Sequence, residues 1–208
     1  VIVKMQLNGV ALDSEVLHNM SIKLAGQLSD IESAIYGVVG HEFNINSSRQ
    51  LGGVLFDEMR LPRTKKIKTG YSTDASSLES LKAQLDSGES DGVDPRSREV
   101  LVSVIEHRQL SKIKSTYVDT LPLLVNPMTG RIHASYNQTG SATGRVSSNA
   151  PNVQNIPVRT ELGRRVRKAF VAEGAPEHRY YLDFYREMGM SPHGAREFYA
   201  MTNAAPHA

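Results

Sequence analysis

Apolar residues recur every three or four positions over most of the first 120 residues, which is the spacing of amphipathic helices. Asp13 has the side chain of an N-cap and stands just before the first such run. The run predicts a long helix that Gly37 and Gly40 end. Its apolar face is formed by Val16, Met20, Leu24, Leu28, Ile31 and Ile35.

Three further helices are predicted before residue 120. Ser47 and Gln50 are spaced as a capping box ahead of an apolar run, although Gly52 and Gly53 each weaken a helix by roughly 1 kcal/mol if they lie inside it. A short helix follows through Leu78, Leu81 and Leu85, and a longer one runs from about residue 97 to residue 117. Two polar loops, LPRTKKIKTGYST and DSGESDGVDP, separate these helices.

The pattern changes at Leu121. The stretch LPLLVNPMTGRIHASYNQT predicts two short extended runs around an Asn-Pro…Gly turn, because Ile132, Ala134 and Tyr136 alternate with polar neighbours. The stretch ELGRRVRKAFV has an apolar spacing that fits either a helix or a strand. We therefore predict an α+β fold with a boundary near residue 120, all-helical before it and mixed after it.

Composition describes an ordinary globular chain. It has 208 residues, of which 39% are hydrophobic and 22% charged. The absence of cysteine excludes disulfide frameworks and thiolate zinc sites, and it suits a reducing compartment, so we expect a cytoplasmic protein. The apolar runs are too short to cross a bilayer and the start, VIVKMQLNGV, lacks a secretory pattern, so no membrane partner is expected. The first residue is not methionine, which suggests a piece of a longer protein.

Positive charge is concentrated in two parts of the sequence, although the net charge is only +2. Ten lysines and arginines lie between residues 101 and 170, against three acidic residues, and a second basic cluster, RLPRTKKIK, spans residues 60–68. Such clustering is typical of proteins with a phosphate-rich partner. A solvated basic face is the alternative, and charge alone does not decide between the two.

Residues 137–160, NQTGSATGRVSSNAPNVQNIPVRT, are crowded with amides, hydroxyls and small residues but hold few large apolar side chains. They belong to a longer stretch, KIKSTYVDTLPLLVNPMTGRIHASYNQTGSATGRVSSNAPNVQNIPVRTELGRRVRKAFVAE, that resembles bacterial DNA polymerase I, the family A DNA polymerases. FNINSSRQLGGVLFDEMRLPRTKKIKTGYST resembles the tip of that family's thumb, and VKMQLNGVALD resembles the segment that opens its polymerase domain. The resemblance implies a thumb over residues 1–120, the start of a palm over residues 121–173 and a diverged tail over residues 174–208.

In the resembling family, the region equivalent to residues 137–160 contacts primer–template DNA. The minor groove presents hydrogen-bond acceptors at nearly the same places on every correct base pair, so a surface that ignores sequence needs donors. Asn152 and Asn155 could equally build turns around neighbouring prolines, and Tyr136 is expected to pack rather than to stack on a base. The predicted DNA-contacting residues of this segment are Arg145, Asn152, Gln154, Asn155, Asn137, Gln138 and Thr139.

Contacts to backbone phosphates are expected from three groups of residues. Asn46 and Ser47 stand at a helix N-terminus, where free N–H groups and the helix dipole favour an anion. The other two groups lie in the basic loop and at the end of the long helix. They are Lys68, Ser72 and Thr73, and Lys112, Lys114, Ser115 and Thr116. The basic run from Arg164 to Lys168 is interpreted as a solvated helix face.

The resemblance also implies a reaction, the addition of deoxynucleoside triphosphates to a primer 3′ end with Mg²⁺ held between carboxylates. Asp183 lies near the place of the first carboxylate, but the Ser-Gln-Ile-Glu continuation of the family motif is absent, and an ordinary exposed aspartate is the alternative. The fingers helix and the later His-Asp-Glu motif have no counterpart. We therefore expect a monomer that binds primer–template DNA, with no metal site of its own and no primer extension by this chain alone. A non-catalytic duplex-binding protein or relic is the alternative from another class.

Overall fold

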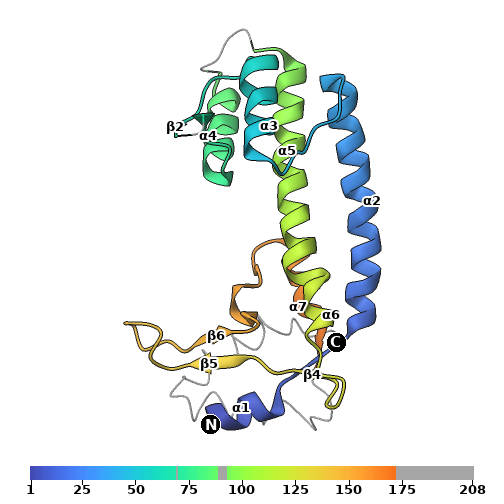
Figure 1. The fold of residues 1–208 in the computed structure, drawn as a ribbon, viewed down its shortest axis with the longest axis vertical. Helices are drawn as coiled ribbons and strands as arrows, with labels where there is room; N and C mark the ends of the chain where they lie inside the picture. Colours follow the sequence, from blue (N-terminus) through green and yellow to red (C-terminus); the bar gives the residue numbers. More distant parts are fainter. Residues whose placement is uncertain (69, 89–92, 172–208) are drawn as a thin grey trace. The chain divides into compact units, whose positions relative to one another are not determined.

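The computed structural model describes residues 1–68, 70–88 and 93–171. Internal packing divides the chain into two compact units (Figure 1). Among the described residues, unit 1 is formed by Val1–Ser21 together with residues 113–171, and unit 2 by those within Ile22–Lys112. Helices and small antiparallel sheets are both present, so the predicted α+β class is confirmed. Asp183 and the predicted tail lie outside the described residues.

Helix α2 (Ser14–Val39) begins in unit 1 and continues into unit 2. Asp13 caps it as predicted, because its Oδ1 accepts hydrogen bonds from the backbone N–H groups of residues 15 and 16, each at 3.1 Å. Gly40 follows its last residue with a φ of +88°, a conformation that favours glycine. The expectation that Gly37 also ends the helix is wrong, since it lies inside α2. The buried face begins at Leu17 rather than at Val16, which is 39% exposed.

Ser47 caps the next helix, α3 (Ser48–Gly52), by accepting a hydrogen bond from the N–H of Gln50 at 3.5 Å. The reciprocal half of the predicted capping box does not form. The Gln50 side chain instead accepts from the N–H of Asn44 at 2.7 Å, which closes the turn before the helix. From Gly53 the backbone widens into a π-helical segment, η1 (Gly53–Glu58).

The remaining elements of unit 2 are a short hairpin and two helices. Both helices were predicted from the apolar spacing. The hairpin lies in the loop predicted from residues 61–73. The elements are β2 (Lys66–Ile67), β3 (Gly70–Tyr71), α4 (Ala75–Asp86) and α5 (Pro95–Ile113). One apolar core joins them, formed by Ile35, Ile45, Leu51, Leu55, Phe56, Leu61, Leu78, Leu81, Leu85, Val100, Leu101 and Val104.

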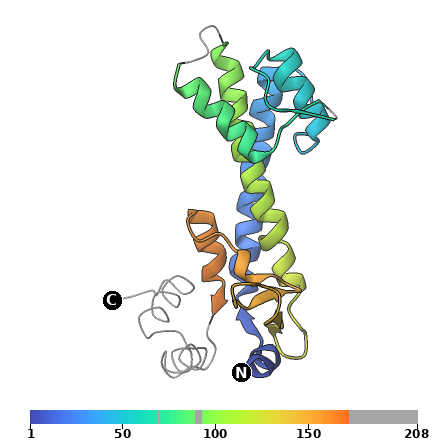
Figure 2. The same cartoon turned by 90° about the vertical axis from the view of Figure 1, so that its left-hand side faces the viewer.

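Unit 1 is built around a three-stranded antiparallel sheet of order β4-β1-β7. Its central strand, β1 (Val10–Leu12), pairs with β4 (Arg131–Ile132) and with β7 (Phe170–Val171), so it brings together segments more than 100 residues apart in the sequence. The pattern of the sequence did not predict β1, because three residues are too few to show an alternation. Figure 2 shows β7 directly after α7 (Glu161–Lys168), so ELGRRVRKAFV forms a helix and then a strand.

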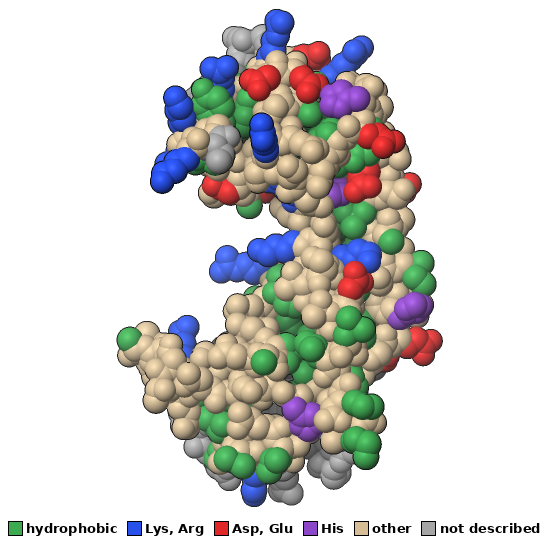
Figure 3. Space-filling model, in the orientation of Figure 1, with side chains coloured by type: hydrophobic (Ala, Val, Ile, Leu, Met, Phe, Trp, Pro, Cys, Tyr) green, Lys and Arg blue, Asp and Glu red, His purple; other side chains and the backbone are tan. Residues whose placement is uncertain are grey.

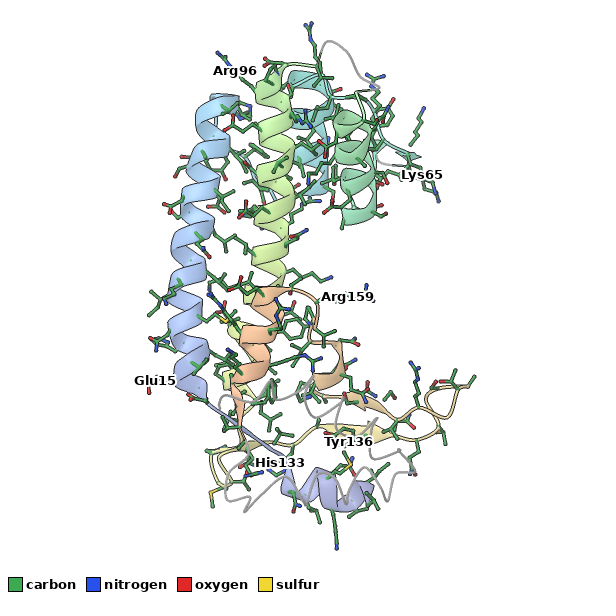
Figure 4. The ribbon with its side chains drawn as sticks, turned by 180° about the vertical axis from the view of Figure 1, so that it is seen from behind. Glu15, Lys65, Arg96, His133, Tyr136 and Arg159 are labelled. Atoms are coloured by element: carbon green, nitrogen blue, oxygen red, sulfur yellow. The ribbon has the colours of Figure 1, made fainter. Side chains whose placement is uncertain are left out.

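Several short elements complete unit 1. They are α1 (Ile2–Asn8), the π-helical η2 (Lys114–Val118), α6 (Thr120–Leu123), β5 (Ser135–Asn137), β6 (Ser147–Asn149) and the 3-10 turn η3 (Val153–Asn155). The extended run predicted at residues 121–125 is therefore wrong. Helix α6 forms over its first three residues and buries Leu121, and Leu124 after it has helical backbone angles, φ −94° and ψ −1°. The turn that follows is confirmed, since the Asn126 carbonyl accepts from the Gly130 N–H at 2.8 Å. Figure 4 shows His133 beside α1, where its Nδ1 is 2.7 Å from the Gln6 carbonyl oxygen.

Candidate nucleic-acid interface

The segment rich in amides and hydroxyls forms a hairpin followed by a tight turn. Strands β5 and β6 pair antiparallel, with Asn137 opposite Ser147, and the loop between them carries Arg145. A Cβ built on Gly140, in the loop between them, would lie 2.8 Å from the Ser147 hydroxyl, so a larger residue there would require that hydroxyl to move. Gly144 has a φ of +74° just before Arg145.

Two asparagine side chains of this segment are oriented by their own backbone. Asn137 Oδ1 accepts from the N–H and the hydroxyl of Thr139, at 2.9 and 3.0 Å. Asn152 Oδ1 accepts from the N–H of Gln154 at 3.1 Å and from the Ser148 hydroxyl at 3.2 Å. A backbone N–H can only donate, so the atom it meets must be the amide oxygen. The NH₂ groups of both asparagines are therefore left without a partner among the described residues.

Gln154 has a structural role that sequence reasoning missed. Its Oε1 accepts from the Ser148 N–H at 3.1 Å, and its Nε2 donates to the Val146 carbonyl at 2.9 Å. The side chain therefore substitutes for a neighbouring strand along β6. One N–H of the amide is not used by these two bonds, so the predicted DNA contact of Gln154 stays a prediction.

Three successive residues after this turn, 155 to 157, are held by other elements of unit 1. The Tyr117 hydroxyl donates to the Asn155 carbonyl at 2.7 Å, and Arg167 Nη2 donates to the Ile156 carbonyl, also at 2.7 Å. Gly163 of α7 packs so closely on Pro157 that a Cβ would come within 2.8 Å of the proline carbonyl carbon. Arg167 is partly buried, and burial lowers its pKa. The interpretation of residues 164–168 as a solvated face therefore does not hold for Arg167. The other three basic side chains of this run are exposed.

Arg145 is exposed and has no hydrogen-bond or ion-pair partner among the described residues. Gln138, Thr139 and Asn155 are exposed as well. Figure 4 labels Tyr136 on β5, where burial raises the pKa of its phenol, and it labels Arg159, which is exposed after the turn. The hairpin and the turn thus carry a surface whose free polar groups include the Arg145 guanidinium and two outward NH₂ groups.

The predicted phosphate contacts of unit 2 differ in their surroundings. Asn46 and Lys68 are exposed, and Ser47 is half-buried at its cap. Ser72 and Thr73 are buried, at 5% and 2% exposure. The Ser72 hydroxyl donates to a carboxylate oxygen of Asp74 at 2.5 Å. Both residues are thus buried at positions where phosphate contacts are predicted, and that role stays a prediction.

One half-buried side chain, that of Arg108, joins the two loops that carry these residues. Arg108 of α5 donates through Nε and Nη2 to the Ile45 carbonyl, at 3.3 and 3.2 Å, and through Nη1 to the Thr73 carbonyl. Its guanidinium contacts carbonyl oxygens rather than a carboxylate, and burial lowers its pKa. The loops at residues 45 and 73 are therefore tied to the same helix.

The third predicted group lies at the end of α5 and in the π-helical η2 that follows it. Lys112, Ser115 and Thr116 are exposed, whereas Lys114 Nζ donates to Asp119 Oδ2 at 2.8 Å. Burial alone would raise the pKa of Asp119, but hydrogen bonds from Lys114 and from the Ser21 hydroxyl, at 2.7 Å, outweigh it and hold the pKa below its usual range. Lys114 is thus already neutralised within the chain.

No group of three or more His, Asp or Glu side chains that could hold a metal ion occurs in the part of the chain that the structure describes. Helices long and apolar enough to span a membrane are also not found there. Asp183, the predicted carboxylate ligand, falls outside that part.

Comparison with known proteins relates most of this chain to a single protein family. The sequence pattern of DNA polymerase family A matches residues 14–186. The chain belongs to this family. Thermostable DNA polymerase I of Thermus thermophilus is 47% identical over 175 residues, which cover 83% of this chain and 19% of that protein. DNA polymerase I of Chloroflexus aurantiacus is 48% identical over 178 residues, 83% of this chain and 18% of that protein. The chain thus spans about a fifth of the length of these family A relatives.

A solved family A structure matches the fold as well. The POL domain of Pol1 from M. smegmatis, in complex with DNA primer-template and dNTP, shares 44% sequence identity with a TM-score of 0.70. The match covers 83% of this chain and 28% of that one. The family predicted from the quoted motifs is therefore confirmed.

Proposed function

We propose that this chain binds primer–template DNA as part of a family A DNA polymerase, with residues 137–159 facing the minor groove. The observation that carries the proposal is the orientation of the two asparagine amides beside Arg145. Their oxygens are used inside the chain, at 2.9–3.2 Å, so their free groups are donors. The solved relative that contains primer-template DNA supports the same partner.

A surface of donors suits the minor groove because every correct base pair presents acceptors there, purine N3 and pyrimidine O2. The NH₂ groups of Asn137 and Asn152 are such donors, and their amide oxygens already accept hydrogen bonds within the chain. The Arg145 guanidinium can only donate. Mixed donor and acceptor groups would instead favour particular bases. The proposed surface therefore holds duplexes of any sequence with similar affinity.

Residues 1–120 are proposed to act as a thumb, and residues 121–173 as the start of a palm. Contacts to the DNA backbone are proposed for the exposed members of the predicted phosphate-binding groups. Asn46, Lys68 and Thr116 are exposed. Each phosphate that a side chain neutralises is expected to add about 0.9 to the slope of log affinity against log salt concentration. Lys114 is expected to add less than one full contact, because Asp119 already pairs with it.

Template-directed nucleotide addition is proposed as the activity in which this surface takes part, by a monomer in the cytoplasm with deoxynucleoside triphosphates as substrate. Family A polymerases use divalent metal ions, which stabilise the attacking and leaving oxygens in phosphoryl transfer. The described residues provide no group of ligands for such ions. We assign DNA binding and orientation to the described part of the chain.

The test is a binding titration with base analogues that remove one groove acceptor at a time. A primer–template with 3-deazapurines in its terminal base pairs lacks minor-groove N3, whereas 7-deazapurines remove the major-groove N7. We expect the 3-deaza duplex to bind about 10-fold more weakly, since a hydrogen bond to a charged group contributes about 1.5–3 kcal/mol. The 7-deaza duplex should bind like the unmodified one, in fluorescence anisotropy at fixed salt.

Arg145→Ala should lose most of the difference between 3-deaza and unmodified duplexes. Arg96→Ala is the matched control, because Arg96 is another exposed arginine, at the start of α5. Two outcomes would show that Arg145 does not face the minor groove. Either both variants bind the unmodified duplex with the same affinity, or the wild-type protein binds the 3-deaza and unmodified duplexes equally well.

A further inference from the structure

Two successive peptide groups at the end of the turn η3 are held by side chains from other elements of unit 1. The Tyr117 hydroxyl of η2 donates to the Asn155 carbonyl, and Arg167 Nη2 of α7 donates to the Ile156 carbonyl, each at 2.7 Å. These donors lie 38 and 11 residues away in the sequence from the carbonyls that they meet. The backbone at Asn155 is therefore fixed by partners outside the turn.

Tyr117, the first of these partners, is itself fixed within unit 1. It is half-buried, and the next residue of η2, Val118, is buried at 1% exposure. Asp119, which follows η2, accepts a hydrogen bond from the Ser21 hydroxyl of α2 at 2.7 Å, so this segment is tied to a second helix. Because η2 is held in this way, the Tyr117 hydroxyl can fix the carbonyl that it contacts.

Arg167, the second partner, lies close to Tyr117. Burial lowers the pKa of Arg167, and the neighbouring Tyr117 acts on that pKa in the opposite direction. The Arg167 side chain is half-buried, and its Nε is buried without a hydrogen-bond partner among the described residues. The bond from Nη2 to the Ile156 carbonyl therefore matters, because losing it would leave a further donor of a partly buried guanidinium unpaired.

The Asn155 amide differs from those of Asn137 and Asn152 in how it is oriented. Those two amides accept hydrogen bonds from backbone N–H groups two residues further along the chain. The Asn155 side chain is exposed, and its amide forms no hydrogen bond among the described residues. Its direction is therefore set by the backbone from which it extends, which Tyr117 and Arg167 hold.

Direction matters at this surface because most of it is uncharged. Figure 3 shows the hairpin β5–β6 mainly as backbone and side chains that are neither charged nor hydrophobic. Contacts of such groups are neutral hydrogen bonds, which weaken steeply when the angle at the hydrogen falls below about 120°. An amide that can turn away from its acceptor therefore contributes less to binding than one whose backbone is fixed.

We infer that Tyr117 and Arg167 are positioning residues for the contact of Asn155 with the minor groove, an inference that rests on the function proposed above. Each acts through a backbone carbonyl and thereby fixes the direction in which the Asn155 amide leaves the turn. Because these bonds form on folding, the turn does not have to be ordered when the duplex binds, and this pre-organisation favours binding.

The test compares two double-mutant cycles of Tyr117→Phe and Asn155→Ala, one in stability and one in duplex affinity. Asn155→Ala keeps the carbonyl that Tyr117 contacts, so the two changes should be additive in urea denaturation. For primer–template affinity at fixed salt, Asn155→Ala should weaken binding of the otherwise wild-type chain about 5-fold, the effect of one neutral hydrogen bond. In the Tyr117→Phe background it should weaken binding less than about 2-fold, because a misdirected amide contributes little.

Asn137→Ala is the matched control for the affinity cycle. Asn137 is oriented by Thr139 in the hairpin and not by Tyr117. Its loss in duplex affinity should therefore be the same in the wild-type and Tyr117→Phe backgrounds. A tyrosine that only stabilised the fold would give additive changes for Asn155→Ala as well, in both cycles.

Arg167→Met and Arg167→Lys form a second arm of the experiment. Methionine cannot donate to the Ile156 carbonyl, so it should weaken duplex binding about 5-fold through the loss of the Asn155 contact. Lysine can donate to the same carbonyl and should recover most of that loss. If Arg167 acts through Ile156, Arg167→Met should leave the salt slope unchanged, whereas a direct phosphate contact would lower it by about 0.9.

The outcomes separate this inference from the proposed function. An Asn155→Ala loss that is equal in the two Tyr117 backgrounds, or absent from the wild-type background, would refute the inference and leave the proposed role of Arg145 standing. A lower salt slope for Arg167→Met would refute the positioning role of Arg167. A wild-type chain that binds no duplex would refute the proposed function together with the inference.

Discussion

Gly163 is the position in unit 1 where one added methyl group should do the most damage. It lies in α7 against the backbone of Pro157, and a Cβ built there would overlap the Pro157 carbonyl oxygen and come within 2.8 Å of its carbonyl carbon and its Cβ. The obstacle is mostly backbone, which cannot rotate away as a side chain can. Gly163→Ala must therefore separate α7 from the segment that follows the proposed DNA-contacting turn.

Two opposing effects set the size of the change. Alanine improves helix propensity over glycine by about 1 kcal/mol, whereas overpacking a well-packed site costs about 1–3 kcal/mol and occasionally more. Separating α7 also strains the 2.7 Å hydrogen bond from Arg167 to Ile156. We expect the upper end of the overpacking range and a net local destabilisation of about 2 kcal/mol, which is about a 30-fold rise in the opening of this region.

Hydrogen exchange measured by mass spectrometry reports this opening directly. Peptides that cover residues 153–168 should exchange about 30-fold faster in Gly163→Ala than in the wild type. Gly26→Ala is the matched control, because Gly26 lies in α2 with no atom within 4 Å of a built Cβ. That variant should be neutral or more stable by up to about 1 kcal/mol. Equal exchange in the two variants would show that α7 does not pack on Pro157 as described.

Three further predictions test the packing of unit 1. Tyr117→Phe should lower the free energy of unfolding by about 1 kcal/mol in urea denaturation, since its hydroxyl donates a hydrogen bond at 2.7 Å. Tyr136→Phe should change it little, because the Tyr136 hydroxyl has no hydrogen-bond partner among the described residues. Gly9→Ala should lower the melting temperature more than Gly40→Ala does. Both have positive φ, +59° and +88°, but only at Gly9 would a Cβ meet a backbone oxygen, at 2.7 Å. The depressed pKa of Asp119 contributes stability above its unfolded pKa of about 3.9 that is lost as pH falls through the lower folded value. Asp119→Asn should therefore flatten the acid limb of the stability–pH curve, and an unchanged limb would contradict the assigned hydrogen bonds.

Local signals explain which helices could be predicted. The Asp13 cap and the apolar spacing of α4 depend on residues within one or two turns of each other, so sequence neighbours decide them. The failures have non-local causes. Strand β1 exists because residues near 131 and 170 pair with it, and Gly37 remains helical because its neighbours already propagate the helix.

The candidate interface likewise has features that the sequence decides and features that only folding decides. The sequence by itself determined the family, the donor-rich character of residues 137–160 and the clustering of basic residues, because these are properties of residue type and order. Only the tertiary structure decided which of those groups are free. The amide oxygens of Asn137 and Asn152 accept hydrogen bonds within the chain, and the Gln154 side chain bonds to the backbone of β6. Lys114 pairs with Asp119, and Ser72 and Thr73 are buried. A side chain's availability depends on partners that folding brings from distant parts of the chain, and no local pattern encodes them.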